Sequence, residues 1–221
     1  MTPTCPVCRS DRTLAFIQVD GLDYWRCPRC LATFLDPAQR PDRKKEKAEY
    51  DRHQNLPDDP GYRRFLSRLA DPLLERLAPG SAGLDFGCGP GPTMALMLVE
   101  AGHRMQLYDP FFHPDRTALE RRYDFITCTE VVEHLHDPAA VFELLDGCLR
   151  PGGWLGIMTR FQTDDSRFAN WHYRRDPTHV VFYRPETFAW LGQRWGWEIE
   201  VMAPDRILAR VGASRMAGAP D

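Results

Sequence analysis

The amino-acid sequence predicts an α/β fold in which a doubly wound, mostly parallel sheet is covered by helices on both faces. From Gly83 onward, short apolar runs typical of buried strands alternate with segments of helical periodicity. Strands this apolar need cover on both faces, which the crossover helices of parallel sheets supply. Two cysteine pairs near the N-terminus predict a small additional block ahead of the sheet.

The first block is expected over residues 1–38. A strand over 13–19 and a turn at Asp20-Gly21 lead into a second strand, "DYWRC", and then a short third one, "ATFLD". Residues 39–60 are polar and rich in proline and charge, which predicts a linker that enters a partly helical lead-in and could form a lid.

The main domain is expected over residues 61–211. It opens with a helix from Tyr62 that Pro79 or Gly80 should end. Strands are then predicted at 82–87, 104–109, 123–129, 151–159, 197–203 and 205–211, and helices at 93–102, 138–149 and 185–195. An irregular aromatic segment occupies 161–184, and the tail over 212–221 has nothing to bury, so we expect it to be disordered.

Composition and charge exclude several classes of protein. The 221 residues are 43% hydrophobic and 27% charged, as in ordinary globular proteins, and the net charge of −3 gives no overall attraction to nucleic acid or anionic membranes. No apolar run is long enough to span a membrane, and the first residues lack the features of a secretory signal. A cytoplasmic location is therefore the default expectation.

Three glycines interrupt the chain just after the first predicted strand of the main domain, in "LDFGCGPGP". A strand, a glycine turn and a helix let the backbone approach a nucleotide-like ligand closely. Asp109 closes the next strand about 20 residues later, where a carboxylate can accept hydrogen bonds from ribose hydroxyls. The loop lacks the Lys-Ser/Thr of a phosphate-binding loop, and the nearby Asp85 favours a positively charged ligand, such as an amino-acid nucleoside sulfonium, over a dinucleotide.

With these motifs the sequence resembles the class I S-adenosylmethionine-dependent methyltransferases, in their small-molecule-type branch. "LDFGCGPG", "LYDP", "YDFITCTEVVEHLHDP" and "LRPGGWLGIMT" are similar to four family motifs and stand in the family's order, and "DPTHVVFYRPETFAWLGQRWGWEIE" is similar to the ending of one branch. The resemblance covers roughly residues 61–211. It implies a Rossmann-like fold with a C-terminal antiparallel strand, and S-adenosyl-L-methionine as the methyl donor.

The resemblance also implies which residues bind the cofactor. The glycines would line its methionine and ribose portions, Asp85 would lie on the side of the methionine amine, and Asp109 would bind the ribose diol. Thr129 and Glu130 would lie beside the sulfonium or the adenosyl edge. The implied cofactor-binding set is Asp85, Gly87, Cys88, Gly89, Gly91, Asp109, Thr129 and Glu130.

One stretch departs from the family pattern. Only 13 residues separate Asp109 from Tyr123, too few for the helix, strand and helix that the family usually has there. The acidic residue that usually contacts adenine therefore has no counterpart. Adenine could instead lie against Phe111 or Phe112, although these rings fit a place in the core equally well.

The paired cysteines predict a structural zinc ion. Cys5, Cys8, Cys27 and Cys30 have the spacing C-x2-C-x18-C-x2-C, which is typical of a four-thiolate zinc ribbon. A block this small has too little core to fold alone, so the metal would supply much of its stability. Four sulfur ligands leave no open position for a substrate, so a catalytic role is not expected. A redox pair or unrelated cysteines are the alternatives.

Methyl transfer from a sulfonium requires an acceptor held in line and, for some acceptors, a base. Candidate residues are Glu133 and His134 after the fourth strand of the family pattern, and His172, Tyr173 and His179 in the aromatic segment; His53 could belong to the lid. We expect Glu133 to order its loop. His134 and His179 are the catalytic candidates, although a histidine here can also be structural.

The aromatic segment predicts the place of the acceptor, because it follows the fifth strand of the family pattern and mixes aromatic with polar residues. The alternative is that its rings only cap the edge of the sheet. A small-molecule acceptor is the leading expectation. The alternatives are an RNA methyltransferase that binds its substrate through the ribbon and the basic run "RPDRKKEK", and a non-catalytic zinc-bearing binding protein.

Overall fold

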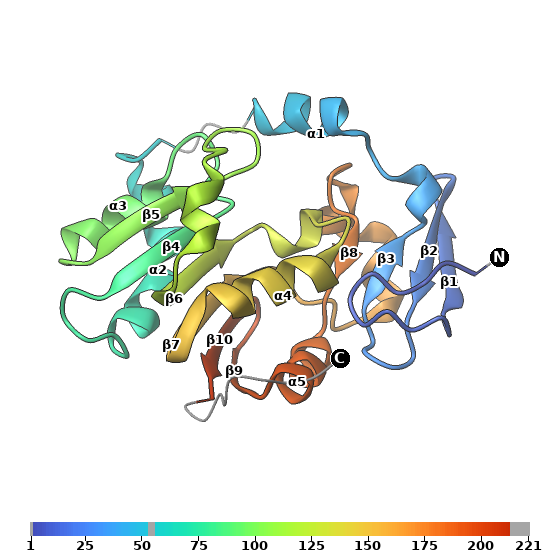
Figure 1. The fold of residues 1–221 in the computed structure, drawn as a ribbon. Helices are drawn as coiled ribbons and strands as arrows, with labels where there is room; N and C mark the ends of the chain where they lie inside the picture. Colours follow the sequence, from blue (N-terminus) through green and yellow to red (C-terminus); the bar gives the residue numbers. More distant parts are fainter. Residues whose placement is uncertain (1, 53–55, 213–221) are drawn as a thin grey trace.

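Six strands form the central sheet of the computed structural model, which describes residues 2–52 and 56–212 (Figure 1). The strand order is β5-β4-β6-β7-β10-β9; the first four are parallel, and β10 runs antiparallel to both β7 and β9. The predicted mostly parallel sheet with a C-terminal antiparallel strand is thus confirmed. The strands are β4 (Ala82–Phe86), β5 (Arg104–Tyr108), β6 (Tyr123–Thr129), β7 (Leu149–Met158), β9 (Trp197–Met202) and β10 (Arg206–Val211).

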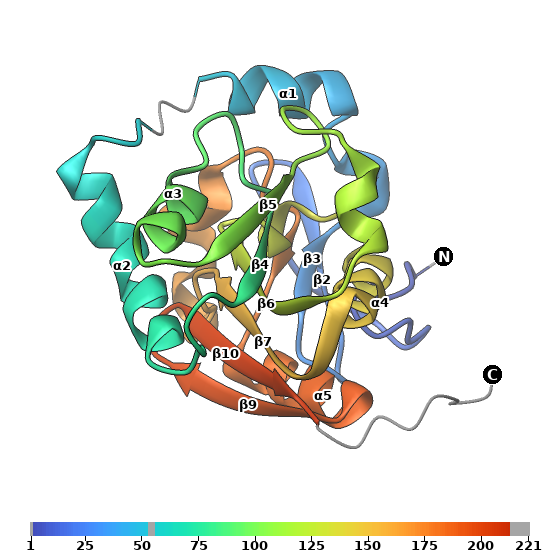
Figure 2. The ribbon, with the colours of Figure 1, turned by 60° about the vertical axis from the view of Figure 1, so that its left-hand side comes forward.

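Helices cover both faces of this sheet, and neighbouring residues of one strand pack against opposite layers. Phe125 of β6 packs with leucines of α2 (Pro60–Leu74) and α3 (Thr93–Glu100). The next residue, Ile126, belongs to the core that contains α4 (Pro138–Cys148) and α5 (Pro185–Trp195). Figure 2 shows α2 and α3 on one side of the strands and α4 on the other. The two-residue alternation of a strand therefore builds both cores.

The first helix of the main domain is shorter than expected, and the stretch after β5 contains little regular structure. The helix α2 ends at Leu74, earlier than the expected stop at Pro79 or Gly80. Residues 110–122, all of them described, contain only the short 3-10 helix η2 (Arg116–Glu120) and one bridge between Asp109 and His113. No strand forms there, as the short spacing predicts, and β5 is left at the edge of the sheet.

A second sheet joins the N-terminal block to the C-terminal half of the chain. It contains β1 (Leu14–Val19), β2 (Leu22–Arg26), β3 (Thr33–Leu35) and β8 (Val181–Phe182), in that order. Asp20 and Gly21 turn between β1 and β2 with φ of 54° and 78°, as a tight hairpin requires. Since β8 belongs to the aromatic segment, the cysteine-bearing block shares its sheet with a segment 150 residues away in sequence.

Aromatic rings hold this second sheet to the main domain. The ring of Phe168 packs edge-to-face against Phe16, Tyr24 and Phe182, at centroid distances of 5.4, 4.9 and 5.1 Å. Tyr183 donates its hydroxyl hydrogen to the carbonyl of Val132, at 2.9 Å. Phe168, Phe182 and Tyr183 lie in 161–184, which also contains the 3-10 helices η4 (Asp165–Asn170) and η5 (His172–Arg175).

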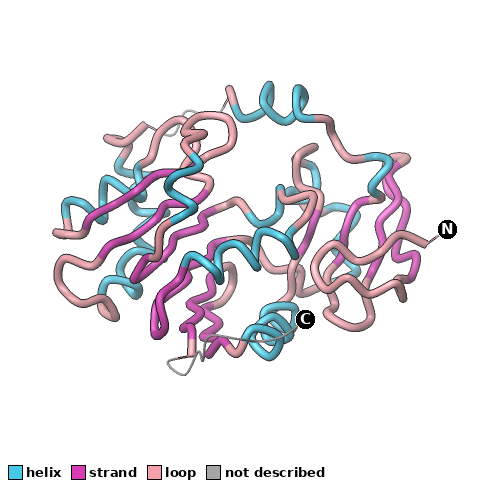
Figure 3. The backbone as a smooth tube through the Cα atoms, viewed as in Figure 1, coloured by secondary structure: helices cyan, strands magenta, loops and turns pink. Residues whose placement is uncertain are grey.

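The expected linker over 39–60 contains the helix α1 (Arg43–Tyr50), and the 3-10 helix η1 (Pro37–Gln39) ends where the linker begins. Asp42 caps α1, since its carboxylate accepts from the backbone N–H groups of Lys44 and Lys45. Figure 3 shows α1 as a separate helix above both sheets, joined by a loop to the N-terminal sheet. His53 and residues 213–221 of the expected tail lie outside the described residues.

No helix in the two described stretches is both long and apolar enough to cross a bilayer. The cytoplasmic location stays a prediction.

Gly83 of β4 tests the close packing of the sheet. A Cβ atom at this position would lie 2.2 Å from Cζ of the fully buried Phe125. We expect Gly83→Ala to lower the free energy of unfolding by about 1–3 kcal/mol through overpacking, measured by urea denaturation. The control is Gly147→Ala on α4, where a Cβ meets nothing within 4 Å; it should leave stability unchanged or raise it by up to about 1 kcal/mol. Equal stabilities of the two variants would contradict this packing argument.

Candidate functional site

A cavity of about 890 Å³ opens where the loops after β4, β5 and β6 meet. Ligand sites in open α/β sheets lie at this carboxyl edge, and the volume suits a nucleotide-sized ligand with a modest second molecule. All of the predicted cofactor-binding residues line it, together with both catalytic candidates: Asp85, Gly87, Cys88, Gly89, Gly91, Asp109, Thr129, Glu130, His134 and His179. The structure therefore brings these residues to one place, and their roles stay predictions.

The glycine loop shapes one wall of the cavity. Gly87 has φ of +74°, and a Cβ atom there would lie 2.5 Å from Cγ2 of Val131, in the loop after β6. Gly89 also has positive φ, +64°, but a Cβ there would meet nothing within 4 Å. Packing thus requires the first glycine, while the second presents bare backbone to open space beside the cavity.

Asp109 organises the loops on which the cavity is built. One carboxylate oxygen accepts a hydrogen bond from the N–H of Gly89 at 3.1 Å, and the other accepts from Phe111 and Phe112 at 2.8 and 3.0 Å. This backbone role was missed by the sequence analysis, although an aspartate that binds N–H groups two and three residues ahead is a familiar turn signal. Asp109 is therefore placed both to hold the glycine loop and to meet a ligand.

Asp85 is an acid in the wall that burial makes harder to ionise. Its side chain is 3% exposed and accepts a hydrogen bond from the hydroxyl of Thr127 at 2.8 Å. Burial raises the pKa of Asp85 to about 6, and the charge of Asp109 adds to the shift. A positive charge bound nearby would favour its ionised form.

Glu130 holds a strained backbone position at the end of β6. Its φ is +52°, a left-handed conformation that side chains other than glycine rarely adopt, and its N–H donates to the carbonyl of Met158. Strain of this kind persists where the surroundings enforce it and often marks a functional site. Burial, and then the neighbouring Glu133, raise the pKa of Glu130 well above its usual range.

A tyrosine hydroxyl lies between the two glutamates. The Tyr173 oxygen is 2.5 Å from Oε1 of Glu133 and 3.2 Å from Oε2 of Glu130. A single O–H can donate to only one of them, so the hydroxyl hydrogen belongs to the shorter contact with the fully buried Glu133. The side chain of Glu133 thus lies at the centre of a buried polar group, and its expected role in ordering the loop stays a prediction.

The two predicted catalytic histidines lie together, with ring centroids 4.6 Å apart. Nδ1 of His134 faces the carbonyl oxygen of Thr178 at 3.2 Å, and Nδ1 of His179 faces that of Tyr173 at 2.6 Å. Burial lowers the pKa of His134, although Glu133 opposes the shift, so its imidazole is neutral at pH 7. His172 is exposed and does not line the cavity.

The cavity's aromatic wall differs from the expected one. Of segment 161–184, which is described throughout, only Asp176 and His179 line the cavity, and Phe168 and Phe182 face the N-terminal sheet instead. The wall rings come from other elements: Tyr50, Tyr62, Phe86, Tyr108, Phe111 and Phe112. Phe111 and Phe112 line the cavity, and their contact with adenine stays a prediction. The part of the wall formed by α1 and α2 carried no recognisable signal in the sequence.

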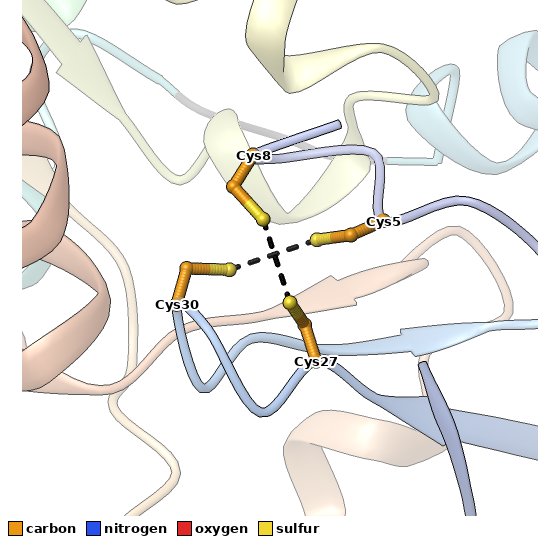
Figure 4. A group of neighbouring side chains, drawn as sticks. All are labelled: Cys5, Cys8, Cys27 and Cys30. Carbon is orange, nitrogen blue, oxygen red and sulfur yellow. Dashed lines mark hydrogen bonds between the residues drawn. The ribbon is translucent and has the colours of Figure 1, made fainter. Parts of the chain in front are cut away.

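The four paired cysteines converge away from this cavity (Figure 4). Their sulfur atoms lie within 4.8 Å of one another, with Cys5 and Cys30 at 3.6 Å and Cys8 and Cys27 at 3.4 Å. A tetrahedral zinc site with Zn–S bonds near 2.3 Å requires sulfur separations of about 3.8 Å. All four are buried and none forms a disulfide. This donor set fits zinc.

The two Cys-x-x-Cys turns have the same local geometry. The residue after each pair, Arg9 or Leu31, has φ near +60° and donates its N–H to the carbonyl of the first cysteine of that pair. Each turn therefore aims two thiols toward one point, which is the geometric reason for the two-residue spacing.

In a comparison with known proteins, residues 60–201 match a family model described as a methyltransferase domain. The ubiquinone biosynthesis O-methyltransferase of Serratia proteamaculans is 34% identical over 77 residues, which are 35% of this chain and 32% of that protein. The aligned part thus spans about a third of the length of this curated relative.

Two solved structures share the fold. The 1,6-didemethyltoxoflavin-N1-methyltransferase of Burkholderia thailandensis, with bound 1,6-didemethyltoxoflavin and S-adenosylhomocysteine, aligns with a TM-score of 0.53 at 17% identity, over 77% of this chain and 87% of that one. A SAM-dependent methyltransferase from Archaeoglobus fulgidus gives 0.51 at 18% identity, over 76% and 100%. At these identities the likeness concerns the fold alone.

The raised pKa of Asp85 predicts a pH dependence of stability. The folded chain holds the proton of Asp85 up to about pH 6, whereas the unfolded chain releases it near pH 4. The contribution of protonated Asp85 to the free energy of unfolding is therefore complete below pH 4 and is lost as pH rises through 6. The free energy of unfolding of the ligand-free wild type, minus that of Asp85→Asn, should therefore fall by up to about 3 kcal/mol between pH 4 and 7.

Urea denaturation at four pH values between 4 and 7 measures this difference. Asp58→Asn, at an exposed position, is the control and should follow the wild type throughout. Parallel pH profiles for the wild type and Asp85→Asn would show that Asp85 is not held in its protonated form.

Proposed function

Since this chain belongs to the methyltransferase domain family through residues 60–201, we propose that it transfers a methyl group from S-adenosylmethionine to a small-molecule acceptor. The observation that carries the proposal is the convergence of the eight predicted cofactor-binding residues on one cavity, beside His134 and His179. When bound, the cofactor supplies a methyl group on a sulfonium, which is already activated for in-line displacement.

The residues present fit this cofactor. The bare backbone of the glycine loop gives its methionine and ribose portions close access, and Asp109 has acceptor capacity left for a ribose hydroxyl. The Asp85 carboxyl, costly to ionise in the empty protein, is suited to the positive charge of the methionine ammonium. Phe111 and Phe112 offer rings to the adenine.

The acceptor shares the same cavity. Helix α1 lines it through Arg43, Glu46 and Tyr50, which leaves space for a modest-sized molecule beside the cofactor. His134 and His179 are placed to orient the acceptor or to accept its proton. Among the relatives, the B. thailandensis structure contains a small-molecule ligand, 1,6-didemethyltoxoflavin, together with S-adenosylhomocysteine, which supports an acceptor of this class.

The charged groups of α1 favour a small-molecule acceptor over RNA. The Arg43 guanidinium lies over the Phe111 ring at 4.7 Å and donates to the carbonyl of Pro110, and Lys47 pairs with Asp51 at 2.7 Å. Arg43 and Lys47 are thus engaged within the protein, and the net charge of −3 gives no overall attraction to RNA.

We also propose that Cys5, Cys8, Cys27 and Cys30 bind one structural zinc ion, which would stabilise the turns that carry β2 and β3. His179 lies two residues before β8, and β8 pairs with β3. The zinc site therefore supports, through this sheet, the segment that places His179 in the cavity wall.

The cofactor assignment predicts binding of both S-adenosylmethionine and S-adenosylhomocysteine, measured by calorimetry. Asp109→Asn should weaken binding at least about tenfold, because one carboxylate oxygen that serves the ribose and the loop is replaced by an amide N–H₂. Glu143→Gln, exposed on α4, should leave the affinity unchanged.

The function itself is tested with a radiolabelled methyl donor, supplied with either a metabolite extract or total RNA. Label should enter the metabolite fraction. Label in RNA alone would favour the RNA alternative, and a chain that binds neither cofactor nor its product at millimolar concentration would be a binding protein instead.

The zinc assignment predicts one zinc ion per chain, found by elemental analysis of protein purified without added metal. Cys8→Ser should release it and reduce methyl transfer more than cofactor affinity, because the ribbon contacts the segment of His179 rather than the glycine loop. Cys148→Ser, outside the cluster, should retain the metal. Zinc-free wild type with four freely titrating thiols would contradict the assignment.

A further inference from the structure

Glu133, His134 and His179 form a second group of side chains with metal-binding atoms. One carboxylate oxygen and one ring nitrogen from each histidine lie within 4.8 Å of one another. The proposed function uses the histidines singly, as orienting groups or bases, and assigns no role to the three as a set. Their convergence at the wall of the cofactor cavity calls for a separate explanation.

The hydrogen bonds of the two histidines use Nδ1 of each ring, so Nε2 of each is left for another partner; Nε2 of His179 lies 3.8 Å from Oδ2 of Asp176. A backbone carbonyl can only accept, so Nδ1 of His134, facing Thr178, and Nδ1 of His179, facing Tyr173, must each carry the hydrogen. In the neutral form of an imidazole with this tautomer, Nε2 is a lone-pair donor. Metal-binding histidines are commonly held in this way, with the second nitrogen donating to a carbonyl.

Glu133 adds a buried carboxylate with one oxygen atom available to bind a cation. Its side chain is fully buried; Oε1 accepts from Tyr173, while Oε2 has no hydrogen-bond partner in the described part of the chain. Glu130 lies on the other side of the same hydroxyl. Neither glutamate forms an ion pair with a lysine or arginine in the described ranges, although the charge of Arg160 opposes the rise in the pKa of Glu130.

We propose that Glu133, His134 and His179 bind a divalent metal cation at the wall of the cofactor cavity, with Glu130 as a nearby carboxylate. Two imidazoles and a carboxylate suit manganese, iron, cobalt, nickel or zinc better than calcium or magnesium. Three protein ligands leave coordination positions open, and His134 and His179 both line the cavity.

These open positions indicate the class of acceptor. A molecule with a hydroxyl or carboxylate oxygen could complete the coordination and be held beside the methyl donor. This part of the inference rests on the proposed function, whereas the metal site itself does not. A histidine bound through Nε2 is unavailable as a base, so the metal site replaces the general-base role for these two residues.

Manganese is the probe, because a four-thiolate site strongly prefers softer zinc, so Mn²⁺ reports on the second site alone. The full-length zinc-loaded chain is titrated with Mn²⁺, and free ion is followed by its electron paramagnetic resonance signal. We expect one Mn²⁺ per chain in addition to the zinc. Glu133→Gln and His134→Ala should each weaken Mn²⁺ binding at least about tenfold.

His172→Ala is the matched control, since this exposed histidine lies in the same segment as His179 and outside the cavity. It should bind Mn²⁺ as the wild type does. Circular dichroism and cofactor binding check that each variant is folded; should Glu133→Gln unfold, His134→Ala, at the partly exposed end of the group, provides the result.

The outcomes separate the two proposals. A wild type that binds S-adenosylmethionine but no Mn²⁺ overturns the metal site and leaves the methyltransferase intact. Mn²⁺ binding without cofactor binding overturns the proposed function alone. Folded Glu133→Gln or His134→Ala chains that keep wild-type Mn²⁺ affinity, or an equal loss in His172→Ala, would place the ion elsewhere and overturn the assignment.

Discussion

Val180 links the N-terminal sheet to the loop after β6 through two backbone hydrogen bonds, while its side chain is buried in the core. Its carbonyl accepts a hydrogen bond from the N–H of Leu35 in β3, and its own N–H donates to the carbonyl of Glu133, at 2.9 and 2.8 Å. The N-terminal sheet, the aromatic segment and the loop after β6 therefore meet at this residue. A block with so small a core depends on this junction and on its cysteine cluster for its place in the fold.

The missing strand after β5 has a structural consequence for the cavity. With only η2 between β5 and β6, the cavity on this side is closed by Asp109, which binds three backbone N–H groups, and by α1 from the N-terminal half. Arg43 reaches the carbonyl of Pro110, and the ring of Tyr50 packs on Phe111. A segment that first looked like a linker thus covers the place where the family usually has a longer insertion.

Two carboxyl groups in the cavity wall, Asp85 and Glu130, and the fully buried Glu133 beside them indicate which ligands the cavity can receive. Asp85, Glu130 and Glu133 are withdrawn from water, and burial is the largest cause of the raised pKa of Asp85 and Glu130. Such groups destabilise an empty site unless they are protonated or paired. A cationic cofactor at Asp85 and a metal ion at Glu133 would each relieve this cost, which links the energetics of the fold to binding.

The features of this protein that the sequence alone determined are those that depend on interactions between residues close together in the chain. The bounds of β6 and α5, the glycine loop and the four-cysteine spacing depend on periodicity, positive φ and turn geometry, all of which act within a few residues. Tertiary structure alone decided that β8 pairs with β3, that Phe168 faces the N-terminal sheet, and that Glu133 lies against His179. These contacts join residues 46 to about 150 positions apart, and only the packing of the whole chain selects among such pairings.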